Sequence, residues 1–168
     1  MTVRYFAYGS NLLYARLYAR CSSIVNIGVA RLDGHRLHFN KPGGDDSGKC
    51  GIEVVETEEY VLGVLYQMDK REKPVLDRIE GIGHGYIDQK IQVRTEQGIV
   101  ECFTYYPTRL DRQIRPFDWY KAFVLEGARE NRFPAHYLGM IASIEALVDP
   151  HHERRSSNYA IISAKSPD

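Results

Sequence analysis

The amino-acid sequence predicts an α+β fold, a mixed β-barrel of about six or seven strands with flanking helices. Strand-like segments fill most of residues 3–106, and turn-forming residues separate them. The region after residue 115 instead has the apolar spacing of helices. A mixed sheet of this size most simply pairs its edges by closing into a barrel. The 168 residues suffice for one domain, with a core expected over about 3–147 and a tail over about 148–168.

Charge and cysteine content exclude several classes of protein. Basic and acidic residues number 22 each, so the chain lacks the electrostatic footprint of a protein that binds nucleic acid or an anionic membrane. Cys21, Cys50 and Cys102 are widely spaced and odd in number, which argues against a disulfide framework and against a zinc site. No apolar run reaches the roughly 20 residues of a membrane span, and none resembles a signal peptide. We therefore expect a soluble cytoplasmic protein with a small-molecule partner.

The segment around which the chain is organised lies close to its start. Val3–Tyr8 is apolar enough for a buried strand, and Gly9-Ser10-Asn11 ends that strand before a short helix over Leu12–Ala19. Gly9 permits a close backbone approach, and we expect Ser10 or Asn11 to cap the helix. The bare N–H groups of such a loop can hold an anion or the oxygen of a polarised carbonyl.

The segments that follow are predicted to be mainly strands. Alternating apolar residues over Ile24–Asn40, broken by the turn signal Asp33-Gly34, predict a hairpin. The turn formers of Lys41–Lys49 predict an irregular loop. Two further strands are expected over Cys50–Glu56 and Tyr60–Met68, and the second is apolar enough to be buried on both faces.

After residue 70 the sequence predicts one helix, then two strands, and then two further helices. Pro74 near its start and Gly81 after its end bound a helix over Lys70–Glu80. The Gln97-Gly98 turn separates two strands, and two helices and a polar tail follow them. In the tail, Tyr159–Ile162 is expected to add an edge strand or to pack against the body. The remaining expected ranges are strands over Tyr86–Arg94 and Ile99–Tyr106 and helices over Pro116–Asn131 and Pro134–Leu147.

Glu80 is the first candidate for acid–base chemistry. It ends a predicted helix, where a carboxylate lies against the negative end of the helix dipole, and this placement favours a proton-carrying role. Glycines follow it directly, so it would border an open site. Taken alone, Glu80 fits a solvated helix end better than a catalytic role, since most charged residues lie on the surface.

Tyrosines form the second candidate set. Each offers an apolar ring and a hydroxyl that can orient a small polar ligand, and the chain has twelve of them. The candidates are Tyr5, Tyr8, Tyr86, Tyr105 and Tyr106, of which we expect about one or two to touch a ligand.

The first strand, the loop that follows it and the Glu80 carboxylate at a helix end together match the pattern of a known family. The sequence resembles the γ-glutamylcyclotransferases, and the matches extend from Tyr5 to about Leu147. The opening octet with a later Glu-Gly at this distance is specific. The matching segments are Tyr5-Phe-Ala-Tyr-Gly-Ser-Asn-Leu12, Val29-Ala-Arg-Leu32, Gly63-Val64, Leu76-Asp-x-x-Glu-Gly81, Tyr86 with its strand, and Tyr120-Lys with Gly127-Ala-x-Glu-Asn131.

The resemblance implies a small mixed β-barrel that acts on γ-glutamyl compounds without a metal or an organic cofactor. It implies that Glu80 moves the proton while the substrate's own α-nitrogen attacks its γ-carbonyl, which gives 5-oxoproline and a free amine. The loop would bind the substrate through backbone N–H groups. The substrate-binding residues that it implies are Tyr8, Gly9, Ser10, Asn11, Leu12, Tyr86 and Tyr105.

The leaving amine and the oligomeric state stay open at this point. The Tyr-Gly-Ser-Asn-Leu form of the loop is closer to relatives that act on γ-glutamyl amino acids than to those specific for γ-glutamylamines or glutathione. Removal of γ-glutamyl protecting groups in antibiotic assembly and a catalytically silent module that binds a small ligand are the alternatives. The expected partner is a small γ-glutamyl substrate, with a homodimer left open and neither nucleic acid nor membrane expected.

Overall fold

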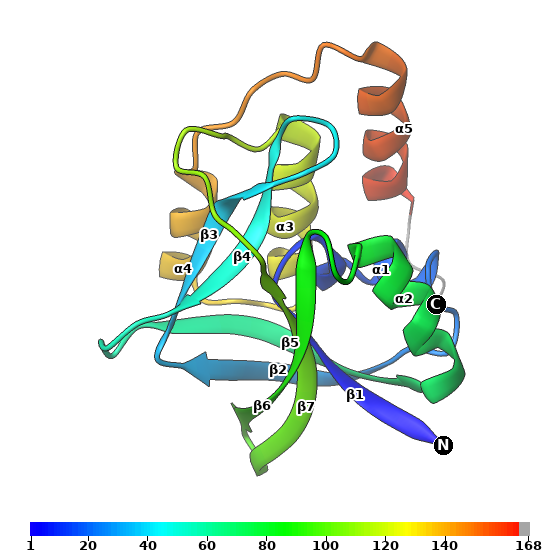
Figure 1. The fold of residues 1–168 in the computed structure, drawn as a ribbon, viewed down its shortest axis with the longest axis vertical. Coiled ribbons are helices and arrows are strands. Elements are labelled where there is room, and N and C mark those ends of the chain that lie inside the picture. Colours follow the sequence, from blue (N-terminus) through cyan, green and yellow to red (C-terminus); the bar gives the residue numbers. More distant parts are fainter. Residues whose placement is uncertain (165–168) are drawn as a thin grey trace.

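The computed structural model describes residues 1–164, which form seven strands and five α-helices (Figure 1). Five strands close into a barrel in the order β1-β5-β2-β6-β7, and the other two form a separate sheet, β3-β4. The predicted α+β mixed barrel with flanking helices is confirmed, although five strands rather than six or seven close it. The strands are β1 Thr2–Ala7, β2 Val25–Asp33, β3 His35–Pro42, β4 Gly48–Val54, β5 Tyr60–Asp69, β6 Tyr86–Thr95 and β7 Gly98–Pro107.

The barrel is closed by its first and last strands. β1 pairs antiparallel with β5 on one side and parallel with β7 on the other, where Tyr5 is opposite Phe103. The buried Thr104 hydroxyl adds a hydrogen bond to the Phe6 carbonyl (2.8 Å). Because every other strand pair in the barrel is antiparallel, this one parallel contact makes the sheet mixed.

The hairpin predicted between Ile24 and Asn40 is wrong. The turn does lie at Gly34, whose φ is 67°, but its amide donates to the Glu59 carbonyl (2.8 Å) and the chain leaves the barrel there. β2 therefore pairs with β5 and β6, whereas β3 pairs with β4. A turn signal shows where a chain bends, and it does not show which strand becomes the neighbour.

The loop predicted over Lys41–Lys49 is shorter than expected. Lys41 is paired with Lys49 and Pro42 with Gly48, so β3 and β4 continue almost to the tip and only residues 43–47 form the connection. Within that connection, the Asp45 carboxylate accepts hydrogen bonds from the Lys49 ammonium (2.8 Å) and the Ser47 hydroxyl (2.8 Å).

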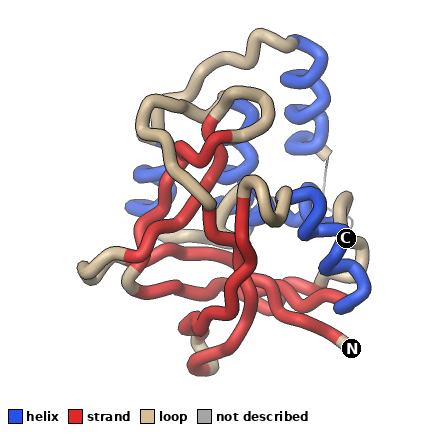
Figure 2. The backbone as a smooth tube through the Cα atoms, viewed as in Figure 1, coloured by secondary structure: helices blue, strands red, loops and turns tan. Residues whose placement is uncertain are grey.

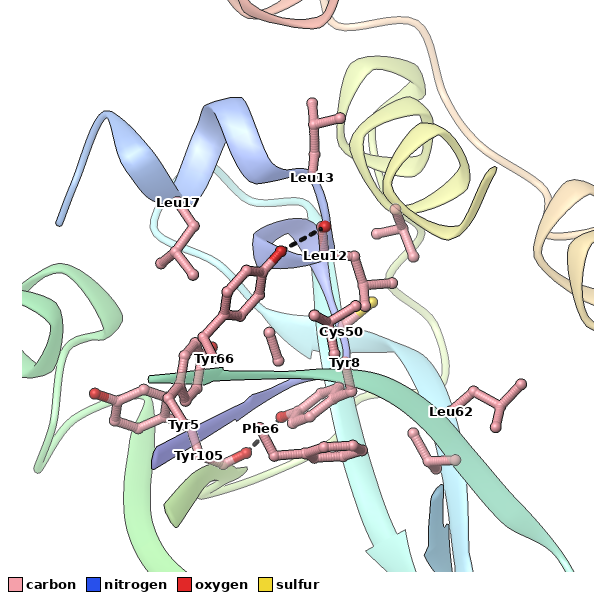
Figure 3. Close-up of a cluster of buried hydrophobic side chains, with 14 of the residues drawn as sticks. Tyr5, Phe6, Tyr8, Leu12, Leu13, Leu17, Cys50, Leu62, Tyr66 and Tyr105 are labelled. Carbon is pink, nitrogen blue, oxygen red and sulfur yellow. Dashed lines mark hydrogen bonds between the residues drawn. The ribbon is translucent and has the colours of Figure 1, made fainter. Parts of the chain in front are cut away.

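β5 lies at the centre of the core. All six residues from Val61 to Tyr66 are buried, which confirms the prediction of a strand buried on both faces. Gly63 is needed where β5 meets β1, because a Cβ there would lie 2.5 Å from the Ala7 carbonyl oxygen and from the Phe6 ring. Figure 3 shows how side chains of β1 and β5 pack together beneath the loop that follows β1.

The helices gather on one side of the barrel (Figure 2). The predicted helix over Leu12–Ala19 is reduced to a 3₁₀ turn and the short α1, and the one expected to reach Leu147 ends at Ala142. After it, Leu147 pairs with Phe117 in an isolated bridge. No helix within residues 1–164 is long and apolar enough to cross a membrane. The helices are α1 Tyr14–Tyr18, α2 Lys73–Glu80 after a 3₁₀ turn over Lys70–Glu72, α3 Asp118–Glu130, α4 Ala135–Ala142 and α5 His152–Ser163.

The tail forms a helix that packs against the body. The alternative of an edge strand over Tyr159–Ile162 is wrong, since these residues belong to α5, which contacts α1 and α3. Asp149 links α5 to α3 through hydrogen bonds. Its buried carboxylate accepts hydrogen bonds from Trp119 Nε1 (2.7 Å), Arg154 Nε (2.6 Å) and the His151 amide (2.8 Å). These bonds, chiefly the one from Arg154, hold the pKa of Asp149 well below its ordinary value.

Replacing Asp149 with asparagine should lower the free energy of unfolding by about 2 kcal/mol near pH 7, because the buried donors lose a charged acceptor. Since the folded pKa is depressed, this stabilisation is present above the carboxyl's ordinary pKa and is lost as the pH falls towards the folded pKa. The difference between wild type and variant should therefore shrink at about pH 3. Urea unfolding at both pH values measures it, with the exposed Glu58→Gln as control. An equal difference at both pH values would contradict this role.

Candidate active site

A small open pocket lies where the loop after β1 meets the end of α2. It joins residues that are far apart in the sequence, since Asn11 and Glu80, 69 positions apart, are in direct contact. Strands β1, β4, β6 and β7 and helix α3 complete its walls. The lining residues are Tyr5, Tyr8, Gly9, Ser10, Asn11, Cys50, Glu80, Tyr86, Tyr105 and Tyr120.

The loop after β1 supplies backbone donors to this pocket. It contains one 3₁₀ turn over Ser10–Leu12, and within residues 1–164 the amides of Gly9, Ser10 and Asn11 donate no hydrogen bond. Gly9 allows the close approach expected of it, because a Cβ there would lie 2.9 Å from the Cys50 Cβ. Free amides grouped on one turn can bind a carboxylate or a carbonyl oxygen.

The prediction that Ser10 or Asn11 caps a helix is wrong. Neither the 3₁₀ turn nor α1 has a side-chain cap. The Ser10 hydroxyl instead accepts a hydrogen bond from Arg16 Nε (3.1 Å), and the Asn11 amide group points across the pocket to Glu80. The two polar side chains of the loop therefore organise the site.

Glu80 is held at the edge of the pocket by the way its helix ends. Gly81 takes a left-handed conformation (φ 70°) and its amide donates to the Arg78 carbonyl (3.2 Å), so α2 stops directly after Glu80. The Glu80 side chain is 17% exposed, and its Oε1 accepts a hydrogen bond from Asn11 Nδ2 (3.0 Å). In the part of the chain that the structure describes, no hydrogen bond reaches Oε2. That oxygen is available to a bound molecule.

Arg20 orients the two sides of the site at once. Its Nη1 donates to Glu80 Oε1 (3.0 Å) and to Asn11 Oδ1 (2.9 Å). Asn11 in turn donates to the Tyr5 hydroxyl (3.1 Å). The sequence did not point to Arg20, because its spacing from Arg16 indicates only a shared helix face and its partner lies 60 positions away.

The tyrosines form a rigid neutral wall. The Tyr8 hydroxyl donates to the Tyr105 carbonyl (2.5 Å), the Tyr86 hydroxyl to the Cys50 carbonyl (2.6 Å), and the Tyr105 hydroxyl to Asp77 Oδ1 (2.7 Å). Burial raises the pKa of Tyr8, Tyr86 and Tyr105 well above the ordinary value, so all three stay protonated. Their hydroxyl groups donate hydrogen bonds within the protein, and their rings form part of the pocket wall.

Strand β5 and helix α3 support the loop from behind. Tyr66 and Asn131 both donate to the Leu12 carbonyl (3.1 and 3.2 Å), and Figure 3 shows the first of these bonds. Gly127 lets α3 approach closely, because a Cβ there would lie 2.4 Å from the Leu13 amide nitrogen. The loop is thus fixed by packing as well as by hydrogen bonds.

Seven of the eight predicted site residues line the pocket. The exception is Leu12, whose side chain is fully buried in the core. Of the neighbouring candidates Tyr105 and Tyr106, Tyr105 lines the pocket, whereas the Tyr106 hydroxyl is hydrogen-bonded to His35 Nε2 (2.7 Å). Residues 1–164 place no group of three or more His, Cys, Asp or Glu side chains where they could hold a metal ion. The geometry is that of a site for acid–base chemistry on a small molecule, with one carboxylate facing a loop of free amides.

Comparison with known proteins agrees with this class of site. A family model described as the AIG2-like family matches residues 60–141. γ-Glutamylcyclotransferases of Bos taurus and Mus musculus are 36% and 35% identical over 147 and 150 residues, covering 84% and 86% of this chain and 78% and 79% of theirs. A solved γ-glutamyl cyclotransferase superposes with a TM-score of 0.85 at 28% identity, over 98% of this chain and 100% of its own. The chain belongs to the γ-glutamylcyclotransferase family.

Gly127→Ala should destabilise the protein by about 2 kcal/mol, because the new methyl group overlaps loop backbone that cannot simply rotate away. Gly139→Ala is the matched control. It lies in α4 with open space around its Cβ position, so we expect it to be neutral or to stabilise by about 0.5 kcal/mol. Thermal and urea unfolding of both variants measure the difference. Equal effects would show that the contact between α3 and the loop is not tight.

Proposed function

We propose that this protein converts a γ-glutamyl amino acid or amine into 5-oxoproline and the free amine. The observation that carries the proposal is the Glu80 carboxylate, whose Oε1 is held by Asn11 and Arg20 while Oε2 accepts no hydrogen bond from the described residues, in a pocket that Gly9, Ser10 and Asn11 also line. Among the described residues that line the pocket, Glu80 is the only carboxylate, whereas burial keeps the hydroxyls of Tyr8, Tyr86 and Tyr105 protonated. The proposed reaction is the one named for the curated relatives.

Substrate binding uses both sides of the pocket. The loop amides of Gly9, Ser10 and Asn11 donate hydrogen bonds to the α-carboxylate and to the γ-carbonyl oxygen of the γ-glutamyl group, and Glu80 Oε2 accepts a hydrogen bond from the α-ammonium. This arrangement folds the substrate so that its α-nitrogen lies close to its own γ-carbon. Holding the two ends of one molecule together supplies much of the rate increase, because the attack is intramolecular.

One carboxylate can serve each proton transfer in turn. Glu80 takes a proton from the α-ammonium, and the freed nitrogen attacks the γ-carbonyl carbon to form the five-membered ring. The loop amides stabilise the negative charge that develops on the carbonyl oxygen. Glu80 then gives the proton to the departing nitrogen as the C–N bond breaks. It passes the second proton of the ring nitrogen to the freed amine, which leaves a neutral lactam and an ammonium ion, so the carboxylate ends as it began.

The three cysteines agree with a reducing compartment. Cys21, Cys50 and Cys102 are buried free thiols, and burial raises the pKa of each. They are therefore poor nucleophiles and poor disulfide partners. Free thiols are typical of a reducing compartment, and we propose on this basis that the enzyme is cytoplasmic.

Replacing Glu80 with glutamine keeps the shape and an acceptor for Arg20 but removes the proton carrier. We expect 5-oxoproline formation to fall by at least about a hundredfold. Chromatographic assay of 5-oxoproline from γ-glutamyl amino acids, γ-glutamylamines and glutathione measures it, with Glu58→Gln as a surface control. Full activity in the Glu80 variant would refute the mechanism. Ligand binding without turnover by the wild type would favour a silent binding module instead.

Arg20 acts in this scheme as a positioning residue, because it contacts Glu80 and Asn11 rather than the reacting atoms. Arg20→Met should lower kcat by about tenfold or more, since a carboxylate that rotates freely is less often in place, while KM changes little. Arg20→Lys should recover part of kcat. If KM and kcat change together in both variants, Arg20 has a different role.

A further inference from the structure

A second hollow adjoins the pocket, because the two share Ser10, Glu80, Tyr86 and Tyr120 in their walls. Its volume of about 180 Å³ has room for a group of amino-acid size. We call it the cationic annex, after the four basic side chains that line it: Arg16, Arg20, Lys41 and Lys49.

Two of these four charges are neutralised within the protein. Arg20 pairs with Glu80 (3.0 Å), and Lys49 pairs with Asp45 (2.8 Å). Asp45 and one oxygen of Glu80 are thus engaged, and Arg16 and Lys41 form no ion pair with any described residue.

Lys41 is buried without an ion-pair partner among the described residues. The residue is only 8% exposed, and within residues 1–164 its ammonium makes no hydrogen bond or ion pair; it lies 4.2 Å from the centre of the Tyr86 ring. It is also directly opposite Lys49 in the β3-β4 register, a placement of like charges that costs stability. Burial lowers the pKa of Lys41 by more than the nearby charges of Glu80 and Asp45 raise it.

The connection before β6 leaves room for the Lys41 ammonium. A Cβ on Gly85 would lie 2.5 Å from Lys41 Nζ, so glycine leaves the space that the lysine occupies. This accounts for one position of the glycine-rich segment over residues 81–85.

Arg16 is the second unneutralised group. Its guanidinium lies over the Phe123 ring (4.0 Å), and Nε donates to the Ser10 hydroxyl (3.1 Å). Its Nη1 reaches only the neutral Asn158 side chain (3.5 Å), and no carboxylate in the described chain lies within ion-pair distance. Burial lowers the pKa of Arg16 to about 10.

The departing half of the substrate has to lie beside Glu80, because Glu80 protonates its nitrogen. The annex shares Glu80 with the pocket, so it is where that half extends. A neutral amino acid brings one carboxylate into the annex, whereas an acidic amino acid brings two. We propose, on the basis of the function proposed above, that the annex binds the leaving group and that the enzyme prefers γ-glutamyl conjugates of acidic amino acids, whose carboxylates contact Lys41 and Arg16.

Three matched substrates test this preference: γ-glutamyl-glutamate, its near-isostere γ-glutamyl-glutamine, and γ-glutamylethylamine, which has no carboxylate in the leaving group. We expect wild-type kcat/KM to be at least about tenfold higher for the glutamate than for the glutamine conjugate, and lowest for the ethylamine. Lys41→Met should remove most of the glutamate preference and affect the ethylamine conjugate far less. Lys90→Met, an exposed lysine on β6, is the matched control and should change none of the three.

The wild-type ratios decide the outcome even if Lys41→Met fails to fold. Equal or better turnover of the glutamine or ethylamine conjugate would overturn the annex proposal and leave the proposed function intact. A uniform loss across all three substrates in folded Lys41→Met would overturn the role of Lys41 in specificity. No 5-oxoproline from any conjugate would overturn the proposed function, and the preference with it.

Discussion

The hydrogen bond between the side chains of Asn11 and Glu80 joins the two halves of the candidate active site. One partner stands at the end of the first strand and the other at the end of a helix 69 positions later. Arg20 binds both, so three side chains from separate segments hold one another in place. The backbone at each end of this cluster is held by close packing. Asn11 and Arg20 therefore stay bonded to Oε1 of Glu80, and Oε2 stays available to a bound molecule.

That backbone is fixed by positions where a side chain would not fit. Gly9 lets the loop approach Cys50, Gly127 lets α3 approach the loop, and Gly81 ends α2 in a left-handed conformation directly after Glu80. The closed barrel then sets the distance between these segments, since β1 is paired on both sides. The fold therefore fixes the loop after β1 and the end of α2 relative to each other, and the proposed chemistry depends on the few side chains that these two segments present.

Much of the site could be predicted from sequence because its parts are local. A strand followed by Gly9-Ser10-Asn11, and a helix ended by Gly81 after Glu80, are each recognisable within about ten residues. The family resemblance supplied the pairing between them. Arg20, Lys41 and the non-hairpin path after β2 were not predictable, because each depends on which distant segment becomes a neighbour. A sequence does not show whether a lysine or an arginine will be buried or will find an ion-pair partner. Lys41 differs from a surface lysine in being buried, and that is visible only in the structure.

A crystal structure with bound 5-oxoproline would test most directly whether the loop amides and Glu80 act on the same γ-glutamyl group. We expect oxygens of the product to accept hydrogen bonds from the amides of Gly9, Ser10 or Asn11, with the ring nitrogen within hydrogen-bond distance of the Glu80 carboxylate. A product bound outside this pocket, or one whose ring nitrogen faces away from Glu80, would contradict the proposed mechanism.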